Sequence, residues 1–290
     1  MVVSPAPVPL WGSFGPKDAT HRFLTQRQCP SLATVQAIQS NDGKQITLSR
    51  LSKRESVTFS TVPHAESKKM TASLWDENVL VQDMGDKVAH FLQTIVDEDE
   101  EVSEGLKKGG IRLVAQAVED SRAANDRYVP AAARTLTGSS PPVGFTDGFP
   151  ILIACVSSLR ELNGRLEEKG KDSLPMSRFR PNIVITGTDP FEEDRWKVIR
   201  IGGKHLFHVV KGCPRCKQSC TDQQTGQVTE EPLETLREFR AMTGNKENLY
   251  FAQNALAGAG TAGQSISIGD SVEVLQWGKP VWDEEPVKES

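Results

Sequence analysis

Residues 196–215 read WKVIRIGGKHLFHVVKGCPR, and this stretch decides the fold class. Apolar and β-branched side chains predominate in residues 196–201 and 205–211, and the pair Gly202-Gly203 separates the two runs. Such runs on either side of two glycines predict a β-hairpin. His205 and His208 fall within the second run. We expect them to be ordinary strand residues that pack or face solvent.

The chain outside this hairpin also consists mainly of short strands. Further strands are expected at 31–38, 45–51, 56–62, 73–82, 111–117, 149–154, 182–186 and 265–275. Helical spacing is found only at 84–95 after Asp83, at 158–168 after Ser157, and at 232–240. The charged run 97–101 (DEDEE) and the glycine-rich 258–263 (GAGTAG) are interpreted as solvated loops. Many strands and few helices predict a mixed α/β, β-rich fold, with a β-barrel or strongly curved sheet.

Length, charge and cysteine content exclude several classes of protein. The 290 residues suit about two domains. A net charge of −4 and a 6% aromatic content argue against nucleic-acid binding. No transmembrane segment or signal peptide is recognisable, because the longest apolar run is 149–156 and the first ten residues contain three prolines. Five cysteines, an odd number, favour a reducing compartment.

The densest chemical signal is Cys213-Pro-Arg-Cys216, which is followed by Cys220. Three interpretations remain open from spacing alone. The two thiolates could bind zinc together with His205 or His208, although a second distant Cys/His pair is absent. They could form a redox pair, although the following 217–222 looks β-like rather than helical. One thiolate could instead bind a metal cofactor, with Arg215 holding an anion beside it.

Two other segments carry polar residues at the start of expected strands. Arg180 and Asn182 lie on a proline-containing turn before 182–186, and a guanidinium group there could bind a phosphate. Asp147, Gly148 and Phe149 form a turn before 149–154, where glycine would let a ligand approach the backbone. Arg180 could equally bond loop carbonyls, and the segment around Asp147, taken alone, is interpreted as an ordinary turn.

Several of these segments, in this order, resemble the MOSC-domain superfamily, and within it the branch of the mitochondrial amidoxime-reducing component. The resemblance rests on residues 144–152 (GFTDGFPIL), 178–187 (RFRPNIVITG), 194–196 (DRW), 213–226 (CPRCKQSCTDQQTG), 231–236 (EPLETL), 251–254 (FAQN) and 268–272 (IGDSV). A weaker likeness at 23–27 (FLTQR) and 79–85 extends it to the N-terminal β domain of that branch.

The resemblance implies a MOSC β-barrel-like domain at 121–278, a truncated β-rich N-terminal domain at 1–120, and a polar tail at 279–290. It implies molybdenum cofactor (molybdopterin) as the bound group, with Cys216 as its thiolate ligand. Arg180, Asn182 and Arg215 would hold the pterin and its phosphate, and the turn at Asp147 would lie beside the metal. That turn includes Gly148 and Phe149.

The same resemblance implies an oxidoreductase that acts on N-hydroxylated or N-oxygenated small molecules. Its electrons would come from a b-type haem cytochrome and a flavin reductase, and its location would be cytoplasmic or mitochondrial-associated. Asp147 would relay protons. An alternative is a sulfur-carrier or cofactor-binding module like the C-terminal part of molybdenum-cofactor sulfurases. The sequence has no lysine motif of a pyridoxal phosphate desulfurase domain, so in this alternative we expect that the chain could not mobilise sulfur alone.

The N-terminal region departs from the family pattern. Relatives begin with a strand that carries a Lys-Ser pair, whereas this chain reaches FLTQR after about 22 residues. A further alternative is therefore a non-catalytic remnant, which cannot hold the cofactor because the Lys-Ser strand is missing. We also expect residues 1–18 to form loose coil, because Pro5, Pro7 and Pro9 lack the N–H that a ladder needs. A sheet edge would then stay unpaired.

Overall fold

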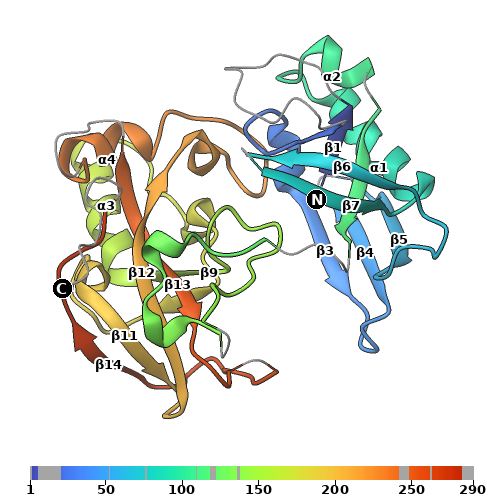
Figure 1. The fold of residues 1–290 in the computed structure, drawn as a ribbon. Helices are drawn as coiled ribbons and strands as arrows, with labels where there is room; N and C mark the ends of the chain where they lie inside the picture. Colours follow the sequence, from blue (N-terminus) through green and yellow to red (C-terminus); the bar gives the residue numbers. More distant parts are fainter. Residues whose placement is uncertain are drawn as a thin grey trace. The chain divides into compact units, whose positions relative to one another are not determined.

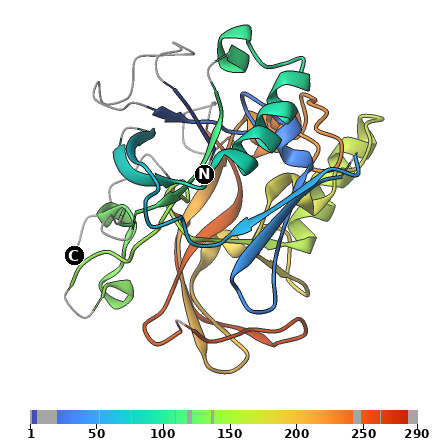
Figure 2. The same cartoon turned by 90° about the vertical axis from the view of Figure 1, so that its right-hand side faces the viewer.

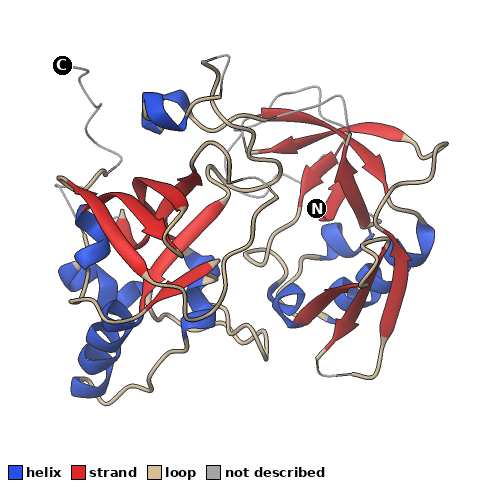
Figure 3. Cartoon of the chain, turned by 90° about the horizontal axis from the view of Figure 1, so that it is seen from below, coloured by secondary structure: helices blue, strands red, loops and turns tan. Residues whose placement is uncertain are grey.

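The computed structural model describes residues 2–5, 21–51, 53–75, 77–108, 110–117, 122–135, 138–241, 248–261 and 263–282. The chain divides into two compact units. One consists of Met1–Arg122 with Thr221–Thr229, and the other of Ala123–Cys220 with Glu230–Ser290. The mixed α/β, strand-rich fold expected from the sequence is confirmed, since the described residues contain only four α-helices among many strands. Figure 3 shows the strands of each unit in red.

The N-terminal unit combines a closed barrel with a small sheet. The barrel has the strand order β1 (Val2–Pro5), β2 (His21–Phe23), β6 (Lys69–Leu74), β7 (Glu77–Asp83) and β8 (Arg112–Gln116). The sheet consists of β3 (Val35–Gln39), β4 (Gln45–Arg50) and β5 (Ser56–Ser60). Helix α1 (Asp86–Glu98) packs beside β5 and β8 and buries Leu92 and Ile95, and the short α2 (Glu104–Lys108) follows it (Figure 2).

Strand β1 contradicts the expectation of loose coil at the start of the chain. Val3 pairs with Phe23 of β2 on one side and with Arg112 of β8 on the other. The barrel is therefore closed, and the expected unpaired edge is absent from it. Proline is tolerated because Pro5 is the last residue of the strand, where a missing N–H costs little. The expectation for residues 6–18 lies outside the described residues.

The acidic run 97–101 is only in part the solvated loop that its charge predicted, since four of its five residues are exposed but Asp99 is buried. Its first two residues complete α1, and Glu98 forms ion pairs with Arg50 and Lys53. Asp99 is only 5% exposed, and its carboxylate accepts hydrogen bonds from the Ser31 N–H at 2.8 Å and the Cys29 thiol at 3.3 Å. A carboxylate is buried here because backbone donors surround it.

A hairpin-like segment from late in the chain completes the N-terminal unit. Thr221–Thr229 leaves the second unit directly after Cys220 and closes on itself through the bridge Thr221↔Val228. Within the N-terminal unit, Gln223 donates to Gln26 at 3.1 Å. Gly226 lies so close to Pro30 that a Cβ atom would come within 3.3 Å of its carbonyl oxygen.

The C-terminal unit is built on a six-stranded sheet with helices against it. Its strand order is β10 (Ile183–Ile185), β9 (Ile151–Cys155), β13 (Leu249–Ala257), β12 (His205–Arg215), β11 (Trp196–Ile201) and β14 (Val272–Trp277). Helices α3 (Val156–Glu168) and α4 (Leu233–Phe239) lie side by side (Figure 1). They pack Leu162, Leu166 and Leu236 against Phe251 of β13.

The sequence predicted the central hairpin of this sheet correctly, but it misplaced some details around it. β11 and β12 pair through Ile201↔His205 across the two glycines, as expected. Ser157 does not cap α3, because its hydroxyl contacts that of Thr188 at 2.7 Å instead. The β-like stretch after Cys216 is a 3-10 helix, η6 (Lys217–Cys220).

Val281 and Trp282, near the C-terminal end of the described residues, pack on β12 at Gly212. The Gly212 N–H donates to the Val281 carbonyl at 2.9 Å, and the Trp282 ring lies 4.5 Å from the Tyr250 ring. A Cβ atom on Gly212 would lie 2.3 Å from the Trp282 ring. Glycine is therefore required here for close approach rather than for an unusual backbone angle.

We expect Gly212→Ala to lower the free energy of unfolding by about 1–3 kcal/mol, because the methyl group overpacks against Trp282. Gly164→Ala is the matched control. It lies inside α3 with nothing within 4 Å of the new Cβ, so it should stabilise the protein by roughly 1 kcal/mol. Urea unfolding of both variants measures this. Equal effects of the two substitutions would contradict the close approach.

A second prediction concerns Glu193, which is wholly buried and accepts from the Ser158 hydroxyl at 2.7 Å. Burial raises the pKa of Glu193, so the folded state binds this proton more tightly than the unfolded chain does. Its contribution to stability is therefore present below about pH 4.3, the unfolded pKa, and is lost as the pH rises through the folded pKa.

We expect Glu193→Gln to stabilise the protein at pH 7 and to have little effect at pH 4. The exposed Glu273, paired with Arg200, supplies the control variant Glu273→Gln, which should change little at pH 7. Urea midpoints at the two pH values test this. A Glu193→Gln effect of the same size at both pH values would show that the carboxyl titrates normally.

Candidate functional site

Parallel pairing of β9 and β10 brings two of the polar segments to the same edge of the sheet. Ile153 pairs with Ile183 in parallel, so the residues before each strand lie together. Asn182 extends this pairing, since its side-chain oxygen accepts from the Leu152 N–H at 2.8 Å and its own N–H donates to the Leu152 carbonyl at 2.9 Å. The Asn182 side-chain oxygen thus has a structural role in joining the two strands.

Arg180 is held in an unusual backbone conformation at this edge. It ends the 3-10 helix η4 (Met176–Phe179) with φ 54° and ψ 46°, the left-handed region that few residues other than glycine adopt. Its side chain reaches the surface, yet the surrounding protein removes enough water to lower the pKa of the guanidinium. Asp147 opposes this shift of the Arg180 pKa, and the like charge of Arg215 adds to it. Both side chains therefore lie within electrostatic reach of Arg180.

Arg215 ends strand β12 and is fixed by two backbone carbonyls. Its Nε donates to the Phe251 oxygen at 2.9 Å and its Nη1 to the Phe179 oxygen at 3.3 Å. The guanidinium also lies 5.3 Å from the centre of the Phe179 ring. Its remaining nitrogen, Nη2, is buried and has no hydrogen-bond partner among the described residues. An unsatisfied buried donor costs about 1–3 kcal/mol, so this nitrogen is a place for a missing acceptor.

The two cysteines of the C-x-x-C pattern flank Arg215 and differ in setting. Cys216 lies between β12 and η6, and Cys213 belongs to β12 itself. Burial raises the pKa of the Cys213 thiol, and Arg215 acts in the opposite direction. Asp147, Cys216 and Lys211 also act electrostatically on Cys213, so these three residues lie within electrostatic reach of its thiol.

The structure thus brings Asp147, Arg180, Arg215 and Cys216 together, although they are far apart in sequence. Gly148, beside Asp147, borders open space, because a Cβ atom there would meet nothing within 4 Å. The next residue, Phe149, is half-buried and packs edge-to-face on Tyr128 with ring centres 6.1 Å apart. The roles that the family resemblance implies for these residues stay predictions.

Sequence reasoning missed Lys211 and Tyr128. The Lys211 ammonium lies 4.7 Å from the centre of the Tyr128 ring, and Lys211 is one of the charges that act on Cys213. Lys211 precedes Cys213 by two residues on the same strand, a spacing that could have suggested it. The cluster therefore holds three cations and one carboxylate, and favours an anionic ligand.

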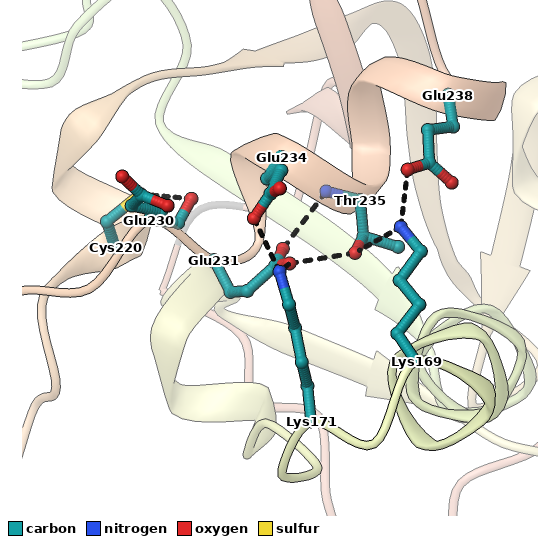
Figure 4. A network of polar contacts seen from close by, with 8 residues as sticks. All are labelled: Lys169, Lys171, Cys220, Glu230, Glu231, Glu234, Thr235 and Glu238. Carbon is teal, nitrogen blue, oxygen red and sulfur yellow. Dashed lines mark hydrogen bonds and ion pairs between the residues drawn. The ribbon is translucent and has the colours of Figure 1, made fainter.

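Polar contacts at the start of α4 support the loop that follows Cys216 (Figure 4). Glu231 accepts from the Thr235 N–H at 3.0 Å and forms an ion pair with Lys171 at 2.7 Å. Cys220, at the end of η6, donates its thiol to the Glu230 carbonyl at 3.6 Å. The chain from Cys216 to α4 is therefore anchored at both Cys220 and Glu231.

The zinc interpretation of the cysteine pattern is not supported. Among the residues that the structure describes, no three His, Cys, Asp or Glu side chains are grouped so that they could hold a metal ion. His205 and His208 are buried strand residues of β12, as expected, and desolvation lowers the pKa of His208. Separately, none of the described helices is long and apolar enough to cross a membrane.

Comparison with known proteins identifies the family to which these residues are similar. A profile described as "MOSC domain" matches residues 140–273, which contain the whole cluster. The chain is 30% identical over 260 residues to "Mitochondrial amidoxime-reducing component 1" of Mus musculus, covering 87% of this chain and 68% of the mouse protein. It is 28% identical over 229 residues to "Mitochondrial amidoxime reducing component 2" of Bos taurus, covering 79% of this chain.

A second kind of relative is much longer. The chain is 25% identical over 265 residues to "Molybdenum cofactor sulfurase" of Oryza sativa subsp. japonica, which covers 86% of this chain and 30% of the rice protein. The match to the Bos taurus protein spans 61% of that protein's length.

We expect Arg215→Lys to lower the free energy of unfolding by about 1–3 kcal/mol, because lysine keeps the charge but cannot reach both the Phe251 and Phe179 carbonyls. Arg200→Lys is the control, since Arg200 pairs with the exposed Glu273 on the surface of the same sheet. That variant should stay within about 0.5 kcal/mol of the wild type. Denaturant unfolding decides, and an Arg215→Lys protein as stable as Arg200→Lys would refute the fixed guanidinium.

Proposed function

The chain belongs to the MOSC-domain superfamily, and on that premise we propose that it binds molybdenum cofactor through Cys216 and reduces N-hydroxylated or N-oxygenated small molecules. The relatives whose names describe amidoxime reduction support this activity.

One observation carries the proposal. Directly beside Cys216, Arg215 has a buried guanidinium nitrogen without an acceptor, and a second guanidinium, that of Arg180, lies within electrostatic reach. Two cations at short range repel each other unless an anion lies between them. The phosphate and pterin edge of the cofactor would supply acceptors, so the donor set suits the group.

Each residue has a task in this proposal. Cys216 supplies the soft thiolate that molybdenum accepts, and the bound cofactor supplies two-electron oxo-transfer chemistry. Arg180, Arg215 and the amide of Asn182 hold the pterin and phosphate. The open space at Gly148 lets the group approach the backbone.

Proton supply falls to Asp147. Conversion of an N–OH group to N–H with release of water consumes two electrons and two protons. The Asp147 carboxyl is exposed, so its side-chain oxygen can take a proton from solvent. In this proposal it then gives the proton to the bound substrate, within electrostatic reach of Cys213 and Arg180. The electrons would come from a b-type haem cytochrome and its flavin reductase, in association with mitochondria.

The match to a plant sulfurase favours a second candidate function. In that alternative the chain carries sulfur or cofactor on Cys216 and performs no turnover of its own. Metal analysis of protein from a host that makes molybdenum cofactor is the first test, and near-stoichiometric molybdenum is the expected result. Turnover of a benzamidoxime-type substrate with reduced dye then separates the oxidoreductase from the carrier.

We expect Cys216→Ser to lose substrate reduction and most bound molybdenum, while Cys213→Ser keeps much of both. The two substitutions make the same chemical change on either side of the Pro214-Arg215 dipeptide, so each serves as the other's control. Molybdenum is measured by mass spectrometry after dialysis. Equal loss in both variants would argue against a single thiolate ligand.

A further inference from the structure

A buried ion pair between Arg240 and Asp194 lies next to strand β13 and contains none of the residues of the candidate site. Arg240 and Asp194 form two contacts, from Nη1 at 2.8 Å and from Nη2 at 3.0 Å, and their residues are 4% and 8% exposed. Gln253 donates to the same carboxylate at 2.7 Å. A buried ion pair is weak evidence for stability, because desolvation offsets its attraction. We therefore look for the role of the Arg240–Asp194 pair in the backbone geometry that it fixes in β13.

That geometry is a break in the pairing of β12 with β13. Gly212 pairs with Gln253, and two residues further on Pro214 pairs with Tyr250. Between these pairs Cys213 alone faces both Phe251 and Ala252, which is a β-bulge with the extra residue on β13. Bulges bend a strand and redirect its groups, and they are common beside active sites.

The bulge contains a strained residue. Ala252 is wholly buried and has φ +66°, a left-handed conformation that is normally left to glycine at such positions. Strain of this kind persists only where the surroundings impose it.

The ion pair clamps the chain on both sides of that residue. Arg240 Nε donates to the Tyr250 carbonyl at 2.8 Å, and the Arg240 carbonyl accepts from the Tyr250 N–H at 3.2 Å. On the other side, Gln253 is tied to Asp194. The two bulge residues thus lie between two anchored neighbours.

The carbonyl that lies between the anchors is the one that orients Arg215. It belongs to Phe251 and accepts from Arg215 Nε at 2.9 Å, while the Phe251 ring stacks on Phe179 with centres 3.9 Å apart. The Phe179 carbonyl accepts from the same guanidinium.

We propose that Asp194, Arg240 and Gln253 are positioning residues, which hold the Phe251–Ala252 bulge so that it fixes the direction of the Arg215 guanidinium. That this direction serves cofactor binding rests on the proposed function. The bulge and its effect on Arg215 stand without it.

The test uses the full chain with ¹⁵N-labelled arginine, and follows the Nε–H signal of Arg215 in cofactor-free protein. Arg215→Lys assigns the signal. In Asp194→Asn, and in the milder Gln253→Met, loss of the clamp should speed hydrogen exchange at this group by roughly tenfold, the equivalent of one hydrogen bond. Gln253→Met keeps the proposal testable if Asp194→Asn does not fold.

Rescue distinguishes positioning from general stability. Glycine adopts a left-handed φ without a clamp, so adding Ala252→Gly to Asp194→Asn should restore slow exchange at Arg215. Ile199→Val, a core change in β11 away from the bulge, is the control for destabilisation and should leave the Arg215 signal unchanged. Unchanged Arg215 exchange in Gln253→Met, or failure of the glycine rescue, would overturn the proposal.

Bound molybdenum provides the second readout. Asp194→Asn should lose several-fold more molybdenum on dialysis than Ile199→Val, with recovery in the glycine double variant. If Arg215 exchanges faster but molybdenum is retained, the link from the clamp to the cofactor is wrong. If wild-type protein holds no molybdenum, the proposed function fails, and the Arg215 exchange data still decide the positioning role.

Discussion

The hydrogen bond from Arg215 to the Phe251 carbonyl is the interaction on which the candidate site depends. It joins the end of β12 to the bulge in β13, and through the second bond to Phe179 it reaches the loop that carries Arg180. Three distant segments therefore meet at one planar cation, which a lysine could not replace because its single ammonium has no fork. The thiol of Cys216 is presented from the next residue of the chain.

Local sequence signals were sufficient for much of the fold. The hairpin of β11 and β12 follows from β-branched runs around two glycines, and α1 and α3 follow from helical spacing of apolar residues. Charge and proline content gave wrong predictions in two segments whose structure depends on contacts with residues far away in the sequence. Asp99 is buried because Ser31, 68 residues away, donates to it, and β1 forms because β2 and β8 flank it.

The candidate site shows the same division. Resemblance to a family could point to Asp147, Arg180 and Arg215, but the dual role of Asn182 in strand pairing is visible only in three dimensions. Ala252 is the clearest case, since a buried alanine in a strand gives no sign of a left-handed backbone. Its conformation depends on Asp194 and Arg240, which precede it by 58 and 12 residues and have no spacing that would connect them.

The excursion of Thr221–Thr229 has a consequence for how the chain is made. Neither unit is continuous in sequence, because the N-terminal one receives Gln223 and Gly226 only after most of the other has been synthesised. During translation from the N-terminus, the contacts of Gln26 and Pro30 with Thr221–Thr229 cannot form until about a hundred residues beyond Arg122 have been synthesised. The N-terminal unit therefore receives its last segment, Thr221–Thr229, only after residues up to Cys220 of the other unit have been synthesised.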